Sequence, residues 1–134
     1  AQNFNQHVVL RYAGIEITKL DTLRLWPETY LNDSLVNFYL RYLQRDFFKN
    51  DTKRQQFTDS FHIFSTYFYS RMVLDNGVVA YKNVKKDRKD MWNEMKGWTK
   101  GVSIFKKRFL LIPVNYGLHW TFVLVCNPGD VIIN

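Results

Sequence analysis

The stretch from Leu118 to Cys126 constrains the fold more than any other part of the chain. After His119 its residues are all β-branched, aromatic or apolar, which predicts a strand that is buried on both faces. Asn115-Tyr116-Gly117 is a turn signal, so His119 is expected at the mouth of this strand. An imidazole titrates near neutral pH, with an ordinary pKa of about 6.5. A histidine in this place is therefore either a proton-transfer group or a hydrogen-bonding strand end.

The composition predicts one folded domain or part of one. The chain has 134 residues, of which 46% are hydrophobic and 17% aromatic, and this argues against disorder. No apolar run approaches the roughly 20 residues of a membrane span, and the N-terminus carries no signal-peptide pattern. Cys126 is the one cysteine, which excludes an internal disulfide framework and indicates a reducing compartment. The three histidines are far apart, so we expect neither a metal nor a cofactor.

The net charge of +7 comes from one region. Between Lys82 and Arg108 there are ten Lys or Arg and three Asp or Glu, a difference of seven that accounts for the whole excess. Such a run is usually a solvated helix face, and this is the interpretation we favour. Steering of an acidic partner or of nucleic acid is the alternative.

In the first third of the chain, residues 8–12 and 15–17 read as two strands joined by an Ala-Gly turn. Thr18 with Asp21 predicts an N-cap with an acid in the first turn of a short helix, which ends before Pro27. Asn32 caps the clearest helix, and residues 49–60 read as a loop. The apolar face of this helix consists of Leu31, Leu35, Phe38, Tyr39, Tyr42 and Leu43.

Further along, residues 61–64 predict a short strand in which His62 points away from the core, followed by a helix that Ser65 or Thr66 caps. Residues 109–114 predict a second buried strand, whose proline favours a strand end or a bulge. Residues 131–133 look like the beginning of another strand, and the chain stops inside this apolar run, so we expect a piece of a larger fold. An amphipathic helix is predicted to pack Met91, Trp92, Met95 and Trp98 into the core.

Four segments in order resemble motifs of the Ulp/SENP cysteine proteases, which process SUMO-like modifiers. Together they cover the chain from about Thr18 to Cys126, and the VCNPG after the histidine strand is closer to the Ulp2-like branch. The segments are residues 30–40 (similar to WLND…INFYL), 62–69 (FSTFFY), 98–105 (WTKKVDIF), and 112–115 with 118–120 (VPIN…HW).

The resemblance implies roles for four residues. His119 matches the catalytic histidine of the family. Trp120 matches the tryptophan beside it, and Tyr30 stands where most members have tryptophan; in the family these two rings flank a narrow tunnel for the Gly-Gly tail of the modifier. Only residues without a Cβ atom pass between two ring faces, so bulkier tails are rejected by sterics. Asp33 matches an aspartate that contacts the modifier, and helix capping alone remains the alternative.

The resemblance also implies an α+β fold, the papain-like cysteine protease fold of the Ulp1 type, with a central mixed sheet flanked by helices. Residues 1–134 would be the N-terminal half of a single catalytic domain. The family's aspartate, oxyanion glutamine and nucleophilic cysteine follow the histidine strand and have no counterpart here. Cys126 lies seven residues from His119 along one strand, roughly 23 Å away and on the opposite face, so we expect a core residue rather than the nucleophile.

The implied function is that of a nuclear SUMO-deconjugating isopeptidase, which cleaves after the Gly-Gly tail. Its partners would be SUMO or another ubiquitin-like modifier, the conjugates of that modifier, and the remaining C-terminal half of the protease domain, with no membrane. The alternative is a non-catalytic module that binds a ubiquitin-like protein through Tyr30, Asp33 and Trp120. Nucleic-acid binding by residues 82–108 is a third and less favoured interpretation.

Overall fold

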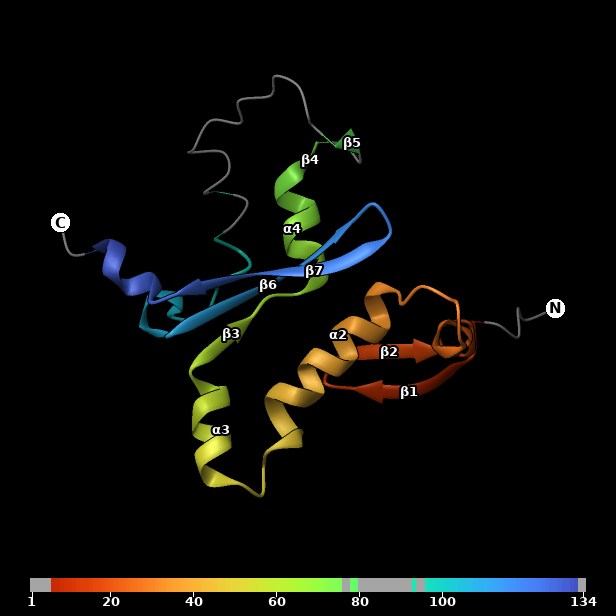
Figure 1. Ribbon diagram of the computed structural model, residues 1–134, viewed down its shortest axis with the longest axis horizontal. Helices are drawn as coiled ribbons and strands as arrows, with labels where there is room; N and C mark the ends of the chain where they lie inside the picture. The colour runs from red at the N-terminus through yellow and green to blue at the C-terminus, as the bar shows by residue number, and fades with distance from the viewer. Residues whose placement is uncertain (1–5, 76–77, 80–92, 94–95, 133–134) are drawn as a thin grey trace. The chain divides into compact units, whose positions relative to one another are not determined.

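The computed structural model describes residues 6–75, 78–79, 93 and 96–132 and divides into two compact units, Ala1–Thr58 and Asp59–Asn134 (Figure 1). Each unit has its own strands and helices and is described separately. Several predictions lie outside the described residues: Met91, Trp92 and Met95 of the amphipathic helix, and residues 82–92 and 94–95 of the basic stretch 82–108.

The first unit begins with an antiparallel hairpin of β1 (Val8–Tyr12) and β2 (Ile15–Thr18), as the sequence predicts. The short helix α1 (Lys19–Thr22) follows directly and continues into the 3-10 turn η2 (Leu23–Leu25). Thr18 is the N-cap of α1, and its hydroxyl accepts a hydrogen bond from the backbone N–H of Asp21. This confirms the predicted cap, because it satisfies an N–H group that the helix itself leaves unpaired.

The longest helix among the described residues is α2 (Asp33–Tyr42), with Asn32 as its N-cap, and it ends in the π-helical turn η3 (Leu43–Phe47). Its apolar face is only partly buried: Leu35 is in the core, whereas Tyr39 is 54% exposed. The ring of Phe38 packs edge-on against Tyr12 of β1, with 5.4 Å between centroids. This contact holds the helix on the hairpin.

A hydrogen bond ties the end of this helical stretch to the hairpin. The hydroxyl of Tyr12 in β1 donates to the carboxylate of Asp46 in η3. This bond raises the pKa of Tyr12 above its ordinary value, and burial and the charge of Asp46 act in the same direction. The tyrosine therefore stays a neutral donor throughout the physiological pH range.

The predicted loop at residues 49–60 is wrong for most of its length, which forms α3 (Thr52–Asp59). The sequence shows no apolar periodicity there, because none of the residues of α3 is buried. The helix is instead started locally, since the side chain of Asp51 accepts a hydrogen bond from Arg54 N–H at 3.1 Å. That aspartate cap is the signal that the sequence interpretation overlooked.

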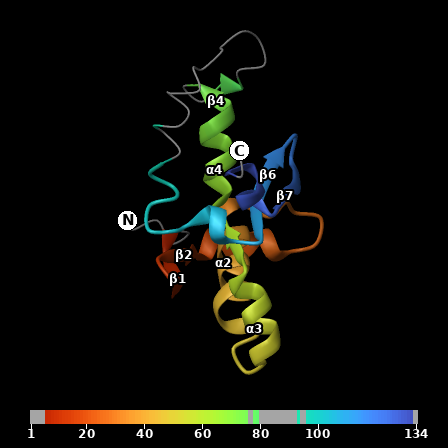
Figure 2. The same ribbon diagram turned by 90° about the vertical axis from the view of Figure 1, so that its left-hand side faces the viewer.

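The second unit is built on a mixed three-stranded sheet, in the order β3 (Phe61–Ile63), β6 (Phe109–Tyr116), β7 (His119–Cys126). β3 runs parallel to β6, and β6 runs antiparallel to β7 over eight residue pairs. Figure 2 shows the pair β6–β7 beside the helix α4 (Thr66–Val73). The remaining elements are short: β4 (Leu74–Asp75), β5 (Val78–Val79), and the 3-10 turns η4 (Ile104–Lys106) and η5 (Pro128–Ile132).

The core of this unit lies between α4 and one face of the sheet. Phe68 of α4 is 2% exposed and its ring stacks on Phe64, with 3.9 Å between centroids. Leu110 of β6 completes the buried cluster. Trp98 packs edge-on against Phe68 at 6.0 Å but is 36% exposed, so it lies at the edge of the core rather than inside it as predicted. Partly buried side chains around the cluster are Met72, Ile104, Ile112 and Val125.

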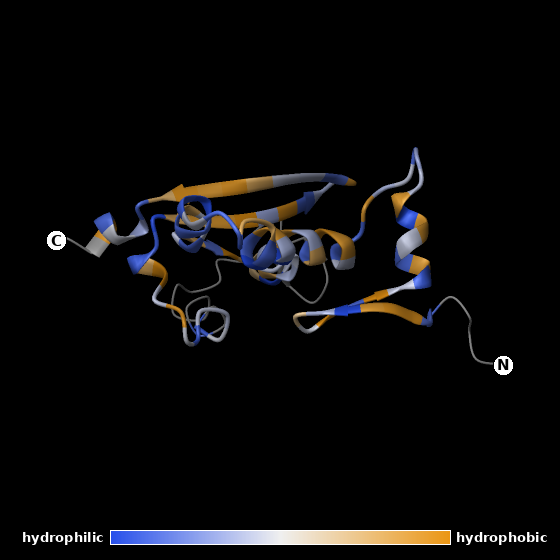
Figure 3. Ribbon diagram, turned by 90° about the horizontal axis from the view of Figure 1, so that it is seen from below, coloured by the Kyte–Doolittle hydropathy of each residue, from blue (hydrophilic) through white to orange (hydrophobic). Residues whose placement is uncertain are grey.

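The structure contradicts the prediction that β7 is buried on both faces. α4 packs on β6, and Val123 on the same face of β7 is 48% exposed, while Phe122 and Leu124 on the opposite face are 63% and 44% exposed. The ribbon coloured by hydropathy shows that β6 and β7 are apolar along much of their length (Figure 3). On this second face, Phe122 and Leu124 of β7 are thus exposed apolar side chains, whereas Pro113 of β6 opposite Phe122 is buried.

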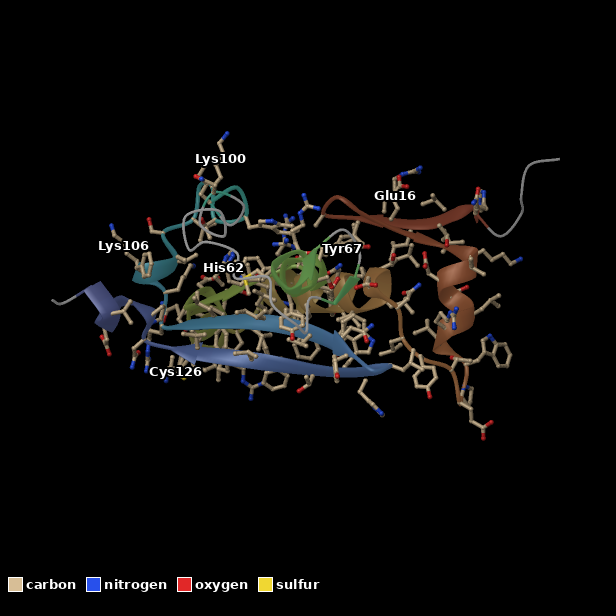
Figure 4. The ribbon with its side chains drawn as sticks, turned by 90° about the horizontal axis from the view of Figure 1, so that it is seen from above. Glu16, His62, Tyr67, Lys100, Lys106 and Cys126 are labelled. Carbon is tan, nitrogen blue, oxygen red and sulfur yellow. The ribbon has the colours of Figure 1, made fainter. Side chains whose placement is uncertain are left out.

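His62 is also placed differently from the prediction. Its ring packs edge-on against the core residue Phe64, with 4.5 Å between centroids, and it pairs in register with buried Leu110 (Figure 4). The alternation of the strand therefore directs His62 to the α4 side of the sheet rather than away from the core.

Pro113 lies inside the β6–β7 ladder, opposite Phe122, rather than at a strand end or a bulge. The C=O of Leu111 points toward β3, where it accepts from Phe64 N–H at 2.9 Å, so the imide nitrogen two residues later points to the same side. β3 pairs with β6 only as far as Leu111. The missing N–H of Pro113 therefore leaves no ladder bond unmade.

The predicted strand at residues 131–133 is wrong for its described part, which belongs to η5. Asn127 adopts a positive φ of 49°, and Asp130 N–H donates to Asn127 C=O at 3.0 Å. These local turns redirect the chain before the apolar residues begin. Gly129 then lies against the backbone of η4, and a Cβ atom added there would come 2.6 Å from Phe105 C=O.

We predict that Gly129→Ala destabilises the complete catalytic domain by about 1–3 kcal/mol, because the added methyl group overlaps a backbone oxygen that cannot rotate away. Chemical denaturation of the domain measures the loss. The control is Val131→Ala in the same turn, whose side chain is 75% exposed and whose truncation should change stability little. Equal stabilities of the Gly129→Ala variant and the parent would show that η4 and η5 do not pack as described.

Candidate active site around His119

The position of His119 is set by the β6–β7 hairpin. Tyr116 pairs with His119 as the last pair of the ladder, which leaves Gly117 and Leu118 as a two-residue turn. Both have positive φ, 57° and 66°, as the turn that matches strand twist requires. His119 is thus the first residue of β7, and it is exposed, as the sequence predicts for a strand mouth.

Leu118 occupies an unfavourable backbone conformation directly before this histidine. Its φ of 66° is in the left-handed region, where a Cβ atom approaches the following carbonyl oxygen and costs about 1–2 kcal/mol. The side chain is 66% exposed, so little burial offsets the cost. Strained residues of this kind cluster at functional sites. The sequence interpretation missed this feature, because neither composition nor spacing signals a left-handed leucine.

Trp120 follows His119 on β7 and is half-buried. Successive residues of a strand point to opposite faces, so His119 lies on the α4 side of the sheet and Trp120 on the side of Phe122. The imidazole of His119 and the indole of Trp120 are therefore adjacent in sequence but lie on different faces of the sheet.

Cys126 is the last residue of β7, at the opposite end of the strand from His119 (Figure 4). It pairs with Phe109 at the far end of the ladder from the Tyr116–His119 pair. The two side chains are also on opposite faces, as predicted. Cys126 is exposed, however, so the expectation that it is a core residue is wrong. It lies on the same face of β7 as the exposed Phe122 and Leu124.

Tyr30 and Asp33 belong to the first unit and lie around the start of α2. Tyr30, in the segment before the helix, is 56% exposed, and Asp33, the first residue of α2, is half-buried. The N-cap Asn32 lies between them, and its Oδ1 accepts from Leu35 N–H at 3.1 Å. The carboxylate of Asp33 is well placed at the positive end of the helix, but no side-chain cap depends on it, because Asn32 provides that bond.

Asp21 supports this helix start from α1. Its Oδ2 accepts from the N–H and the hydroxyl of Thr18, both at 2.7 Å, and its Oδ1 accepts from Asn32 Nδ2 at 2.5 Å. Partial burial alone would raise the pKa of Asp21, but the bonds from Thr18 and Asn32 outweigh it and lower the pKa below its ordinary value. The sequence interpretation identified the cap but not the link to Asn32, since eleven residues separate the pair.

Two kinds of feature are absent from the described residues. No group of three or more His, Cys, Asp or Glu side chains in residues 6–75 and 96–132 is arranged to hold a metal ion. Among the same residues there is no helix with the length and apolarity needed to cross a bilayer.

Comparison with known families gives a match over most of the chain. Residues 29–133 match Peptidase C48, described as the Ulp1 protease family, C-terminal catalytic domain. A probable ubiquitin-like-specific protease 2B of Arabidopsis thaliana is 32% identical over 126 residues. The ubiquitin-like-specific protease 2 of Schizosaccharomyces pombe is 34% identical over 117 residues. These matches cover 88% and 85% of this chain but only 12% and 16% of the relatives.

Solved structures show the same fold at lower identity. A de-sumoylating protease superposes with a TM-score of 0.64 at 20% identity, covering 87% of this chain and 39% of that one. The Ulp1 protease domain in complex with Smt3, the yeast ortholog of SUMO, gives a TM-score of 0.62 at 20% identity, covering 89% and 43%. The α+β fold of the Ulp1 type is therefore confirmed, and the chain spans less than half of each of these solved chains.

The strain at Leu118 gives a prediction about stability. We expect Leu118→Asn to stabilise the complete domain by about 0.5–1 kcal/mol, because asparagine tolerates the left-handed conformation and the leucine side chain is mostly exposed. Leu118→Ala is the matched control, since it removes the same side chain but keeps the strained Cβ, and it should give no gain. Denaturation midpoints of the two variants measure the difference. A gain with alanine as large as with asparagine would show that the φ of residue 118 is not the cause.

Proposed function

This chain belongs to the Ulp1 protease family, and we propose that the complete protein containing it is a cysteine isopeptidase that removes SUMO or a related modifier. The exposed His119 at the mouth of β7 carries the proposal. It matches the catalytic histidine of the family in the VPIN…HW motif. Because the chain spans less than half of the solved Ulp1-type chains, the proposal concerns the whole catalytic domain. We propose these residues as its N-terminal half, from the order of the motifs they resemble.

His119 has the geometry that a general base needs. A base must reach a thiol that approaches from outside, and an exposed imidazole on a rigid strand end allows this approach. The eight-pair ladder fixes the backbone of His119, which limits the motion of its ring. Cys126 is at the other end of the same strand, so the thiol is supplied by the remaining half of the domain.

The proposed reaction proceeds in two steps. His119 accepts the proton of the thiol, and the thiolate attacks the carbonyl carbon of the last glycine of the modifier. The bond between this carbon and the lysine nitrogen breaks, and the imidazolium of His119 gives its proton to the leaving amine. Water then hydrolyses the thioester, with His119 as base again, and releases the modifier with a free carboxylate.

Tyr30, Trp120 and Asp33 are the proposed contacts of the modifier. Two flat rings on either side of the tail admit only glycine residues, so tails with larger residues are excluded by sterics. Tyr30 keeps a planar ring in a place where the family has mostly tryptophan. Support for SUMO as the modifier comes from the related Ulp1 domain, which is solved in complex with Smt3.

The remaining half of the domain is the proposed partner of the exposed sheet face. Phe122 and Leu124 present a continuous apolar strip on β7 that a folded domain would normally cover. We also place the protein in the nucleus, in a reducing compartment, from the family resemblance and the single cysteine.

We predict that His119→Ala in the complete protease lowers kcat/KM for a SUMO substrate at least about a thousandfold, because the members of a catalytic triad act as a unit. Cleavage of a SUMO protein that carries a fluorophore on its last glycine measures this. Since His119 is exposed, the variant should fold normally and still bind SUMO. The matched control is His7→Ala, which removes an exposed histidine of the first unit and should leave kcat/KM unchanged.

The same experiment separates the enzyme from a binding module. A module that only holds a ubiquitin-like protein would bind SUMO equally with and without the His119 imidazole and would show no turnover in either form. Binding without turnover in the complete parent protein would therefore favour the module, and near-normal kinetics of His119→Ala would remove His119 from catalysis.

A separate prediction concerns the 134 residues alone. We expect no peptidase activity from this polypeptide, because its single thiol lies at the other end of β7 from the imidazole. Release of the fluorophore from the SUMO substrate is the assay, and addition of the complete protease is the positive control. Turnover by the isolated chain that disappears in Cys126→Ser would assign the nucleophile to Cys126 and would contradict the proposal.

A further inference from the structure

Three hydrogen bonds converge on the carboxylate of Asp21. One oxygen accepts from the N–H and hydroxyl of Thr18, at the start of α1, and the other accepts from the side chain of Asn32, at the start of α2. The carboxylate thus joins two helix starts whose N-caps, Thr18 and Asn32, are fourteen residues apart. Hydrogen bonds to an ionised acceptor are shorter and about twice as strong as neutral ones. These three bonds to Asp21, called the joint below, therefore form a rigid link between the two helix starts.

The bond between Asp21 and Asn32 is more than a helix cap needs. Capping of α2 requires only that Asn32 Oδ1 accept from Leu35 N–H. Its Nδ2 donates in addition to Asp21, so the two ends of the amide are bound to different partners. An amide whose oxygen and nitrogen are both hydrogen-bonded cannot flip to exchange the two atoms. Asp21 therefore fixes the orientation of the cap and, with it, the first turn of α2.

The segment between the two helices, residues 23–31, is exposed throughout. Trp26 is 67% exposed and Tyr30 is 56% exposed, and Glu28 has a positive φ of 62°. The hydroxyl of Thr29 donates to the C=O of Trp26 at 2.6 Å, which is a bond within the segment itself. The same hydroxyl donates to the C=O of Arg24 at 3.0 Å, so these bonds also lie within the segment, and Asp21 connects its two ends through Thr18 and Asn32.

We propose that Asp21 is a positioning residue that orients Tyr30 and Asp33 for contact with the modifier. Tyr30 lies two residues before Asn32, and Asp33 directly follows it. A shift of the cap therefore moves both side chains together. The inference rests on the proposed function, because it assumes that these two residues form part of the modifier-binding surface. Asp21 does not touch the modifier and acts only through Asn32.

The test is Asp21→Asn in the complete protease, a change that keeps the shape of the side chain. An asparagine retains one acceptor for Thr18, but its amide nitrogen faces the amide nitrogen of Asn32, and two donors cannot bond. We expect KM for the SUMO fluorophore substrate to rise about tenfold while kcat stays within about twofold, since the chemistry at His119 is untouched.

A double variant tests the geometry of the joint. Asp21→Asn combined with Asn32→Asp exchanges the two groups, so that the new amide donates to the new carboxylate, which still caps Leu35 N–H. KM should return to within about twofold of the parent, whereas Asn32→Asp alone places two carboxylates together and should raise KM. A residue that served only general stability would not show this reciprocal rescue.

Thr18→Ala is the matched control for the stability of α1. It removes the hydroxyl from Asp21 but leaves the backbone N–H of residue 18 and the bond to Asn32 in place. We expect a lower Tm with KM unchanged. An unchanged KM in Asp21→Asn, or no rescue in the double variant, would overturn the positioning role. Absence of turnover in the parent protein would instead overturn the proposed function, so the two failures are distinguishable.

Discussion

The antiparallel ladder between β6 and β7 is the constraint on which the second unit depends. Its eight pairs run from Phe109–Cys126 at one end to Tyr116–His119 at the other, so one register decides which residues face α4 and which face outward. A slip of one residue would exchange the two faces and remove Leu110 and Val125 from the core. The same register leaves only Gly117 and Leu118 for the turn, and this places the imidazole at the strand mouth.

A second constraint acts in the first unit, where a single carboxylate joins two short helices. α1 has only four residues, and an isolated helix of that length is unstable in water. Its stability comes from the cap at Thr18 and from the bond of Asp21 to Asn32. The joint holds the residues around the start of α2 in a defined arrangement although their side chains are largely exposed.

The sequence predicted those elements whose cause is local or periodic. The hairpin at residues 8–18, the caps at Thr18 and Asn32, and the strand mouth at His119 all follow from turn and capping residues. The sequence did not predict features that depend on a contact between distant residues, nor a helix that has a capping residue but no apolar face. The start of α3 depends on the cap by Asp51. The burial of β7 depends on which other segments pack against it. The hydrogen bond between Asp21 and Asn32 joins residues on either side of a loop. The roles of His119, Tyr30, Asp33 and Trp120 came from motif resemblance and remain predictions.

The central claim is that His119 activates a thiol from the other half of the domain, and the pKa of that thiol tests it most directly. The rate of alkylation by iodoacetamide, measured against pH in the complete protease and in His119→Ala, reports the thiolate fraction. The account predicts that the parent stays reactive well below the ordinary thiol pKa of about 8.5, and that the variant loses this reactivity below about pH 8. Identical profiles in the two proteins would contradict it.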